Sequence, residues 1–267
     1  MSMRVVFIGD VVGEPGRETL KSAAATIQER WSPDFLIVNG ENAAGGAGLT
    51  PRLAYELMRS KVDVITLGDH AFDQYEIRGF FAEEPRLIRP FNYPQGTPGT
   101  GWTIVQGNGL KLGVVNGMGN TFMKTTVSNP FLGIRRLLDE VRKETQLILY
   151  DFHAETTSEK IAMAHEVDGL VSVIVGTHTH VQTADERILS GGTAAITDVG
   201  FCGAHHSVIG RQVADVLDRY RTQLPTKMNL ARTGLQADGV LVEIDTGSGK
   251  ATQIERFQIK VETPADE

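Results

Sequence analysis

Cysteine is almost missing from this 267-residue sequence, since Cys202 is its single occurrence and no disulfide can form within the chain. Chains without disulfides are typical of a reducing cytosol. Long apolar segments are also missing. The chain passes from Met1–Arg4 directly into VVFIGD, without the apolar segment of a secretory signal, and no later run is long enough to span a bilayer. We therefore expect a cytoplasmic protein that does not enter a membrane.

Positively charged residues are in the minority: the chain has 26 lysine and arginine residues and 33 aspartate and glutamate residues, which gives a formal net charge of −7. This balance argues against the basic surface that binds duplex nucleic acid. A small anionic substrate is compatible with it, because a bound metal ion can reverse the local field. The sequence also lacks repeats and Ser/Pro-rich linkers, and 41% of it is hydrophobic. It is therefore predicted to form one domain over residues 1–267.

Short β-branched apolar runs alternate with amphipathic stretches along most of the chain. The runs predict strands over residues 5–8, 35–38, 62–67, 147–150, 171–175 and 193–197. Helices are predicted over 18–31, 51–61, 72–81, 130–144, 158–166 and 211–221, and hairpins over 102–115 and 240–261. This alternation predicts an α/β fold, with a two-layered mixed β core flanked by helices and antiparallel hairpins at its edges.

Polar residues that can bind metals follow five of the apolar runs. They are Asp10, Glu41, Asn42, Asp69, His70, His153, His178 and His180. Each alone has an ordinary explanation, such as a cap, a solvated side chain or a hydrogen-bonded core histidine. Five strand ends that carry acids, amides and histidines are together better explained by a cation, since the carboxylates would repel one another without it. Mixed oxygen and imidazole ligands suit a centre of two metal ions.

The segment VSVIVGTHTH, residues 171–180, supplies two of these histidines. If it stays extended, alternate side chains point the same way, and His178 and His180 reach one point just beyond the strand. Ligand sites of open α/β sheets lie at that edge. Two exposed loop histidines are the alternative interpretation of the segment, and the other strand ends favour the metal site.

Six motifs in this chain resemble the calcineurin-like metallophosphoesterases: FIGDVVGEPGR, IVNGENAAGGAGLT, TLGDHAFD, DFHAETTSEKIAM, VGTHTHVQTADERIL and ITDVGF. The resemblance is closer still to their YmdB-like branch, bacterial enzymes that hydrolyse 2′,3′-cyclic nucleotides. It spans Phe7 to about Ile209, and VGTHTHVQTADERIL is its most specific part. It implies the calcineurin-like metallophosphoesterase fold, with a two-layered mixed β core flanked by helices.

The resemblance also implies a set of ligands for two transition-metal ions. One ion would be held by Asp10, Asn42 and His180, the other by Asp69, His153 and His178, and Glu41 would bridge the two. Iron or manganese is expected, with zinc or magnesium as the alternative. Two positions depart from the pattern. Val12 stands where the wider superfamily commonly has histidine, and Asp69 stands where the family usually has asparagine.

The implied reaction is hydrolysis of 2′,3′-cyclic nucleotides or similar small phosphoesters. A hydroxide that bridges the two ions would be the nucleophile, and the free His70 would be the general acid that protonates the leaving ribose oxygen. Two alternatives stay open. The same metals could serve a phosphomonoesterase or nucleotidase, or the chain could be a regulatory protein that senses a metal or nucleotide with little turnover.

Other residues are predicted to support the site from outside the ligand set. Asp198, Glu155 and Asp185 follow strands near the motifs, and each could orient a ligand histidine through a hydrogen bond. Residues 121–128 lack periodicity and are interpreted as a loop, and the segment 118–128 could cover a substrate.

Overall fold

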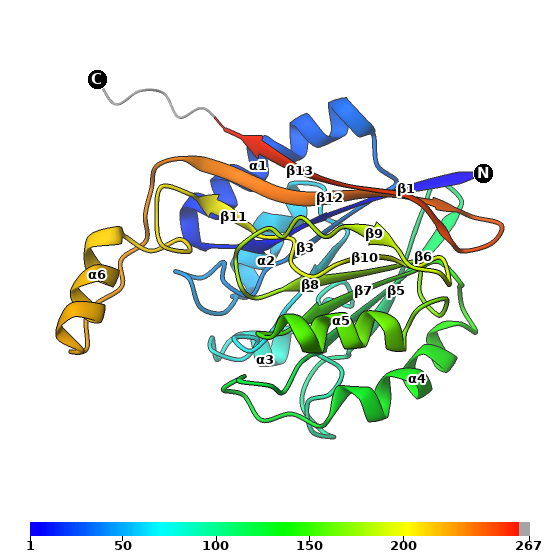
Figure 1. Cartoon of the computed structure of the whole chain (residues 1–267), viewed down its shortest axis with the longest axis horizontal. Coiled ribbons are helices and arrows are strands. Elements are labelled where there is room, and N and C mark those ends of the chain that lie inside the picture. Colours follow the sequence, from blue (N-terminus) through cyan, green and yellow to red (C-terminus); the bar gives the residue numbers. More distant parts are fainter. Residues whose placement is uncertain (262–267) are drawn as a thin grey trace.

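Strand β1 (Ser2–Ile8) is apolar on both faces. In the computed structural model, which describes residues 1–261, Val5 and Phe7 face a core between two sheets, whereas Val6 and Ile8 face helices. Successive side chains of a strand point to opposite faces, so a continuous apolar run needs cover on both. The chain provides it with two β-sheets packed face to face and helices on the outside (Figure 1).

The first sheet holds β1 at its centre. Its strands follow the order β2-β11-β12-β1-β3-β4, and β13 pairs with β12. The other bounds are β2 (Asp10–Val11), β3 (Phe35–Asn39), β4 (Val64–Thr66), β11 (Phe201–Ala204), β12 (Leu235–Asp245) and β13 (Ala251–Lys260). Strands β1, β3 and β4 run parallel, and β12 runs antiparallel to β1.

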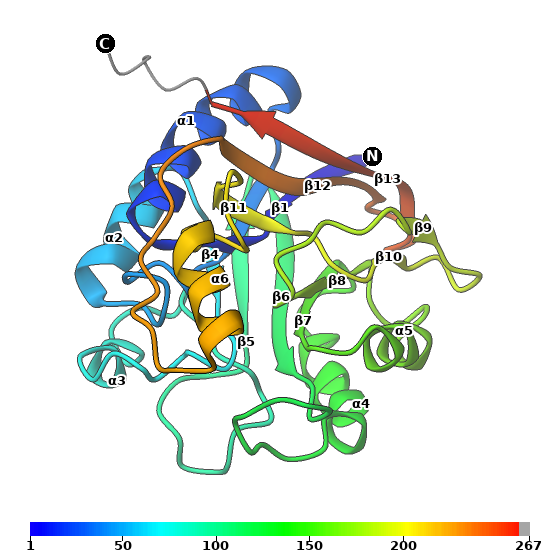
Figure 2. The ribbon, with the colours of Figure 1, turned by 60° about the vertical axis from the view of Figure 1, so that its left-hand side comes forward.

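The second sheet has the order β5-β6-β7-β8-β10-β9. Its strands are β5 (Trp102–Gly107), β6 (Leu110–Met118), β7 (Ile148–His153), β8 (Val173–Thr177), β9 (Arg187–Ile188) and β10 (Ala194–Ile196). Strands β6, β7, β8 and β10 are parallel, and β5 forms an antiparallel hairpin with β6. Figure 2 shows this sheet beside the first one.

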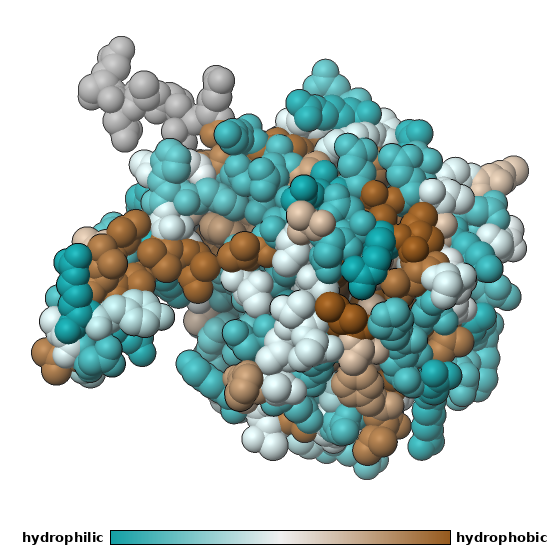
Figure 3. Space-filling view, viewed as in Figure 1, coloured by the Kyte–Doolittle hydropathy of each residue, from teal (hydrophilic) through white to brown (hydrophobic). Residues whose placement is uncertain are grey.

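Helices cover the outer face of each sheet. Those on the first sheet are α1 (Gly13–Trp31), α2 (Pro51–Arg59) and α3 (Ile77–Phe80), and those on the second are α4 (Pro130–Val141) and α5 (Thr157–Glu166). Helix α6 (Val213–Thr222) projects from the body, and Val213 and Leu217 are exposed apolar residues of this helix. Figure 3 shows brown, apolar surface along this arm. No helix among the described residues could cross a membrane, because none is both long and apolar enough.

This architecture confirms the predicted α/β fold with a two-layered mixed core flanked by helices. The helix predicted over 72–81 is wrong in its first half, because residues 70–76 form turns and α3 has only four residues. Strand β7 continues three residues past its predicted end because it stays paired with β6 and β8 as far as His153. The last six residues of the domain predicted over 1–267 lie outside the described residues.

The short strands β2, β9 and β11 were not predicted. Gly9 separates β2 from β1, and a Cβ atom there would overlap the carbonyl oxygen of Gly200. The glycine is therefore explained by the close approach of the chain before β11, a contact between residues far apart in the sequence. Two-residue strands such as β2 carry no periodicity that a sequence pattern could reveal.

Replacing Phe7 with alanine is expected to cost about 3–5 kcal/mol of unfolding free energy, since it removes a fully buried ring from the core between the sheets. Phe122→Ala is the control, because that ring is 86% exposed and its loss should cost less than about 0.5 kcal/mol. Urea unfolding of the chelator-treated proteins measures both values. Equal stabilities for the two variants would contradict the assignment of Phe7 to the core.

Candidate metal centre

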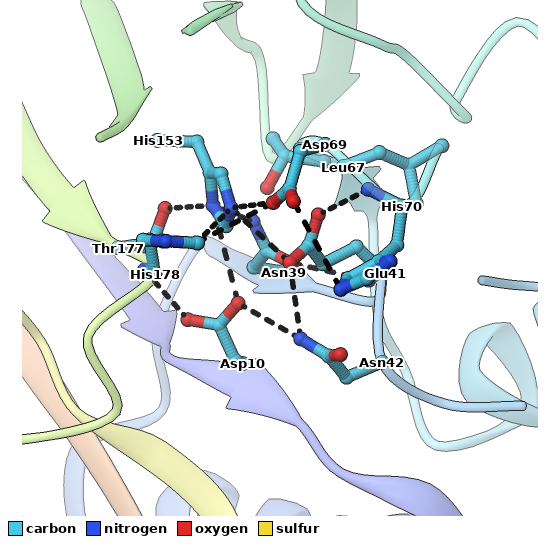
Figure 4. A network of polar contacts seen from close by, with 12 residues as sticks. Asp10, Asn39, Glu41, Asn42, Leu67, Asp69, His70, His153, Thr177 and His178 are labelled. Atoms are coloured by element: carbon cyan, nitrogen blue, oxygen red, sulfur yellow. Dashed lines mark hydrogen bonds and ion pairs between the residues drawn. The ribbon is translucent and has the colours of Figure 1, made fainter. Parts of the chain in front are cut away.

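The predicted site residues all lie at one edge of the molecule, where the parallel strands of both sheets end. The oxygen donors follow strands of the first sheet: Asp10 after β1, Glu41 and Asn42 after β3, and Asp69 after β4. The imidazoles come from the second sheet, with His153 ending β7, and His178 and His180 following β8. Figure 4 shows most of these side chains pointing toward one another. The fold therefore brings acids and imidazoles together from opposite layers.

Four side chains form the denser part of the cluster. One donor atom each from Glu41, Asp69, His153 and His178 lies within 4.8 Å of the others. His153 Nε2 is 3.1 Å from Glu41 Oε1 and 3.1 Å from Asp69 Oδ1. His178 Nδ1 is 3.4 Å from the same Asp69 oxygen. Burial would raise the pKa of Asp69, but hydrogen bonds from the two histidines outweigh it and lower that pKa below its usual range.

Asp10, Asn42 and His180 form the second part. Asp10 Oδ1 lies 3.5 Å from Asn42 Nδ2 and 3.9 Å from His180 Nε2. Asn42 Nδ2 also donates to Glu41 Oε1 at 3.0 Å, so Glu41 contacts both parts. An amide binds a metal through its oxygen. Asn42 would therefore act as a ligand only after a rotation that exchanges its nitrogen and oxygen.

Gly68 leaves the space at the centre of the denser part. A Cβ atom there would overlap both Glu41 Oε2 and His153 Cδ2. The ion-pair partners of Asp10, Glu41 and Asp69 within the described residues are all histidines. Carboxylates so close together need a cation, and carboxylate with imidazole is a donor set that suits transition metals. The residues present therefore fit a metal centre.

The proton on His153 is located by its neighbours. Its Nδ1 lies 2.9 Å from Thr177 Oγ1, and that hydroxyl donates its proton to Asp151 Oδ1 at 2.8 Å. Since the hydroxyl proton is used, His153 Nδ1 is the donor to Thr177, and Nε2 is the ring nitrogen that faces the cluster. Asp151 also accepts from Thr66 and Asn39, and burial raises the pKa of this carboxyl to about 7.

The other two histidines are oriented in the same manner. His178 Nε2 donates to Glu155 Oε2 at 3.0 Å, which leaves Nδ1 toward Asp69. His180 Nδ1 donates to the carbonyl of Ile209 at 3.3 Å, which leaves Nε2 toward Asp10 and Asn42. Partners that hold the remote N–H group are a regular feature of metal-binding histidines. Glu155 thus contacts His178, one of the histidines predicted as ligands.

The extended backbone predicted for VSVIVGTHTH is wrong beyond Thr177. His178 has φ 101° and His180 has φ 61°, both in the left-handed region, so the two imidazoles are not related by strand alternation. They reach different parts of the cluster. Asp198 was predicted to orient a histidine directly, but it accepts from Thr179, the residue between them. Asp185, also predicted there, instead accepts from Thr183 and the backbone of Thr197.

His70 lies beside the denser part. Its backbone N–H donates to Glu41 Oε2 at 3.2 Å, and its Nε2 is 3.9 Å from Asp69 Oδ2. Its Nδ1 is 2.7 Å from Asp73 Oδ2, a partner that the sequence analysis missed. Burial would lower the pKa of His70, but the charges of Glu41, Asp69 and Asp73 outweigh it and raise that pKa.

Comparison with known proteins identifies the family of this chain. The model of the YmdB-like protein family matches residues 6–257. This chain belongs to the YmdB-like family. A Bacillus subtilis (strain 168) protein named 2′,3′-cyclic-nucleotide 2′-phosphodiesterase is 46% identical over 257 residues, which cover 96% of this chain and 97% of that protein. A putative phosphatase/phosphodiesterase of Mycoplasma pneumoniae is 34% identical, with 98% and 95% covered.

Solved structures of similar proteins share the fold. A hypothetical protein from Thermus thermophilus superposes on this YmdB-like chain with a TM-score of 0.90 at 39% identity, covering 97% of this chain and 99% of that one. A structure described as a novel Mycoplasma pneumoniae phosphatase superposes with a TM-score of 0.91 at 33% identity, covering 97% of this chain and 94% of that one. A putative 5′-nucleotidase from Staphylococcus aureus superposes with a TM-score of 0.60 at 14% identity, covering 98% of this chain and 55% of that one. At this low identity the similarity concerns the fold alone.

The segment 118–128 of this YmdB-like chain borders the cluster, as a covering loop would. Thr125 Oγ1 donates to the backbone carbonyl of Asp69 at 3.3 Å. Asn92 holds the base of the segment, because its amide donates to the carbonyls of Met118 and Ser128. Lys124 remains exposed. The segment is thereby held next to Asp69.

Gly68→Ala is expected to abolish metal binding, because the new methyl group would overlap Glu41 and His153. Gly79→Ala is the matched control, since a Cβ atom there meets nothing within 4 Å and its backbone suits alanine. Elemental analysis after loading with Mn²⁺ gives the metal content per chain. If Gly68→Ala is folded and retains the wild-type content, the ions do not lie in this cluster.

Proposed function

We propose that this chain is a metal-dependent phosphodiesterase that hydrolyses 2′,3′-cyclic nucleotides. The observation that carries the proposal is the cluster of three carboxylates and three histidines, arranged as two groups around Glu41. The named activity of the Bacillus subtilis relative supports it, because that similarity extends over almost the whole of both chains. A small phosphoester is therefore the proposed partner, and its negative charge suits a cation-binding site.

In the proposed centre, each ion takes ligands from both sheets. Asp10, Asn42 and His180 would hold one ion, Asp69, His153 and His178 the other, and Glu41 would contact both. Iron or manganese is the proposed pair, with zinc or magnesium as the alternative. When bound, two cations supply an activated water nucleophile and neutralise charge on the phosphoryl oxygens. The histidines receive their orientation from Thr177, Glu155 and Ile209.

His70 is the proposed general acid. It contacts the cluster from the side, and its Nδ1 is fixed by Asp73, so Nε2 is the nitrogen that can deliver a proton. The hydrogen bond between Nδ1 and Asp73, which is not a proposed ligand, favours the imidazolium form that a general acid needs. The name of the relative supports cleavage of the 2′ ester, so that the proton would go to the ribose 2′ oxygen and the product would be a nucleoside 3′-monophosphate.

The purified protein is expected to hydrolyse 2′,3′-cyclic AMP to 3′-AMP, to lose this activity after treatment with a chelator, and to regain it with Mn²⁺. Product analysis by liquid chromatography distinguishes this from phosphomonoesterase activity, which would release phosphate from 3′-AMP or 5′-AMP. Faster hydrolysis of the monophosphates would favour the nucleotidase alternative. Tight binding of metal or nucleotide without hydrolysis would favour the sensor.

His70→Ala is expected to keep its metal content and to hydrolyse 2′,3′-cyclic AMP about 10²–10⁴-fold more slowly, as typical for the loss of a general acid. The loss should be much smaller with bis(p-nitrophenyl) phosphate, because p-nitrophenolate leaves without a proton. Steady-state rates with both substrates measure the difference. Equal losses with the two substrates would contradict the acid role, and a loss of metal would make His70 a ligand.

A further inference from the structure

The loop after β8 places two metal-binding residues in unfavourable backbone conformations. His178 and His180 both have positive φ, which residues other than glycine adopt at a cost. Such conformations persist where contacts over-determine them. The backbone N–H of His178 donates to Asp10 Oδ2 at 3.2 Å, and the His180 ring stacks on Phe201. Thr179 lies between the two histidines, so its contacts affect both.

A single carboxylate oxygen holds Thr179. Asp198 Oδ2 accepts from the backbone N–H of Thr179 at 3.0 Å and from its hydroxyl at 2.7 Å. The other oxygen, Oδ1, accepts from the backbone N–H of Gly200 at 2.9 Å. Strands β9 and β10 lie between Thr179 and Asp198 in the sequence. The contact between Thr179 and Asp198 therefore joins the two ends of the segment that contains these strands.

A buried lysine neutralises that carboxylate. Lys160 of α5 reaches Asp198 Oδ2 with its Nζ atom at 2.7 Å, and the two side chains are only 4% and 2% exposed. The aliphatic part of Lys160 passes Gly176, where a Cβ atom would lie 2.9 Å from Lys160 Cδ. A buried ion pair of this kind is costly to break from one side, because the remaining charge stays buried without a partner.

We propose that Lys160 and Asp198 are positioning residues that act through Thr179 to keep His178 and His180 in the geometry that binds metal. The proposal rests on the metal centre of the proposed function. Both oxygens of Asp198 accept hydrogen bonds from Lys160, Thr179 and Gly200, and the Lys160 ammonium has no lone pair, so neither residue is assigned as a ligand or a catalytic residue. Lys160 matters because its charge compensates that of the buried Asp198, and hydrogen bonds to a carboxylate are stronger than those to a neutral group.

The test compares Mn²⁺ affinity in Lys160→Met, Thr179→Val and the double variant, measured from free Mn²⁺ by electron paramagnetic resonance. Thr179→Val removes one hydrogen bond and keeps the ion pair. Each single variant is expected to bind Mn²⁺ about 10–100-fold more weakly, as for other outer partners of metal ligands. If Lys160 and Thr179 act through the same chain of contacts, their effects should not add, and the Mn²⁺ affinity of the double variant should be within about threefold of that of Lys160→Met.

Lys143→Met is the control, because it removes a lysine from an exposed pair with Glu140 and should leave the Mn²⁺ affinity unchanged. If Lys160→Met does not fold, Asp198→Asn replaces it, with the same expected loss. Folded variants with wild-type affinity, or a double variant whose loss is the product of the single losses, would overturn the proposal. A wild-type protein that binds no Mn²⁺, Fe²⁺ or Zn²⁺ would instead overturn the metal centre.

Discussion

Asp10, Glu41 and Asp69 bring three carboxylates into a space where the first two have almost no solvent exposure. Ionised groups so placed repel one another and have lost most of their hydration, and such an arrangement is tolerated only when positive charge is close. The imidazoles of His153 and His178 lie within hydrogen-bonding distance of these oxygens, and a bound cation would supply the positive charge. The absence of a side chain at Gly68 keeps the donors this close.

The rest of the fold serves the placement of those charges. Parallel strands end at the same edge of a sheet, and the two sheets pack so that both edges meet. An apolar core between the sheets holds the strands together. Polar contacts are instead concentrated behind the site, where Asp151 anchors the threonines on either side of it. Rigid strands thereby determine positions, and short hydrogen bonds determine orientations.

Sequence patterns could predict the strands and their polar ends because both are local properties. Apolar runs before Asp10, Glu41 and His153 directly indicate buried strands, and motif resemblance extended this to the ligand groups. The left-handed backbone of His178 could not be predicted, since it depends on a contact between Thr179 and Asp198, which are 19 residues apart. The amide orientation of Asn42, the role of Asp73 and the turns after His70 likewise depend on side chains that meet only in the folded chain.

The origin of the donors in two different sheets has a consequence for the stability of the whole molecule. Oxygen donors come from the first sheet and imidazoles from the second, so every ion held here would be coordinated by both layers at once. Metal binding would then act as a cross-link between the sheets, and the free energy of binding would increase the free energy needed to separate them on unfolding. In such a molecule the concentration of available metal would set the stability of the fold as well as the rate of substrate hydrolysis.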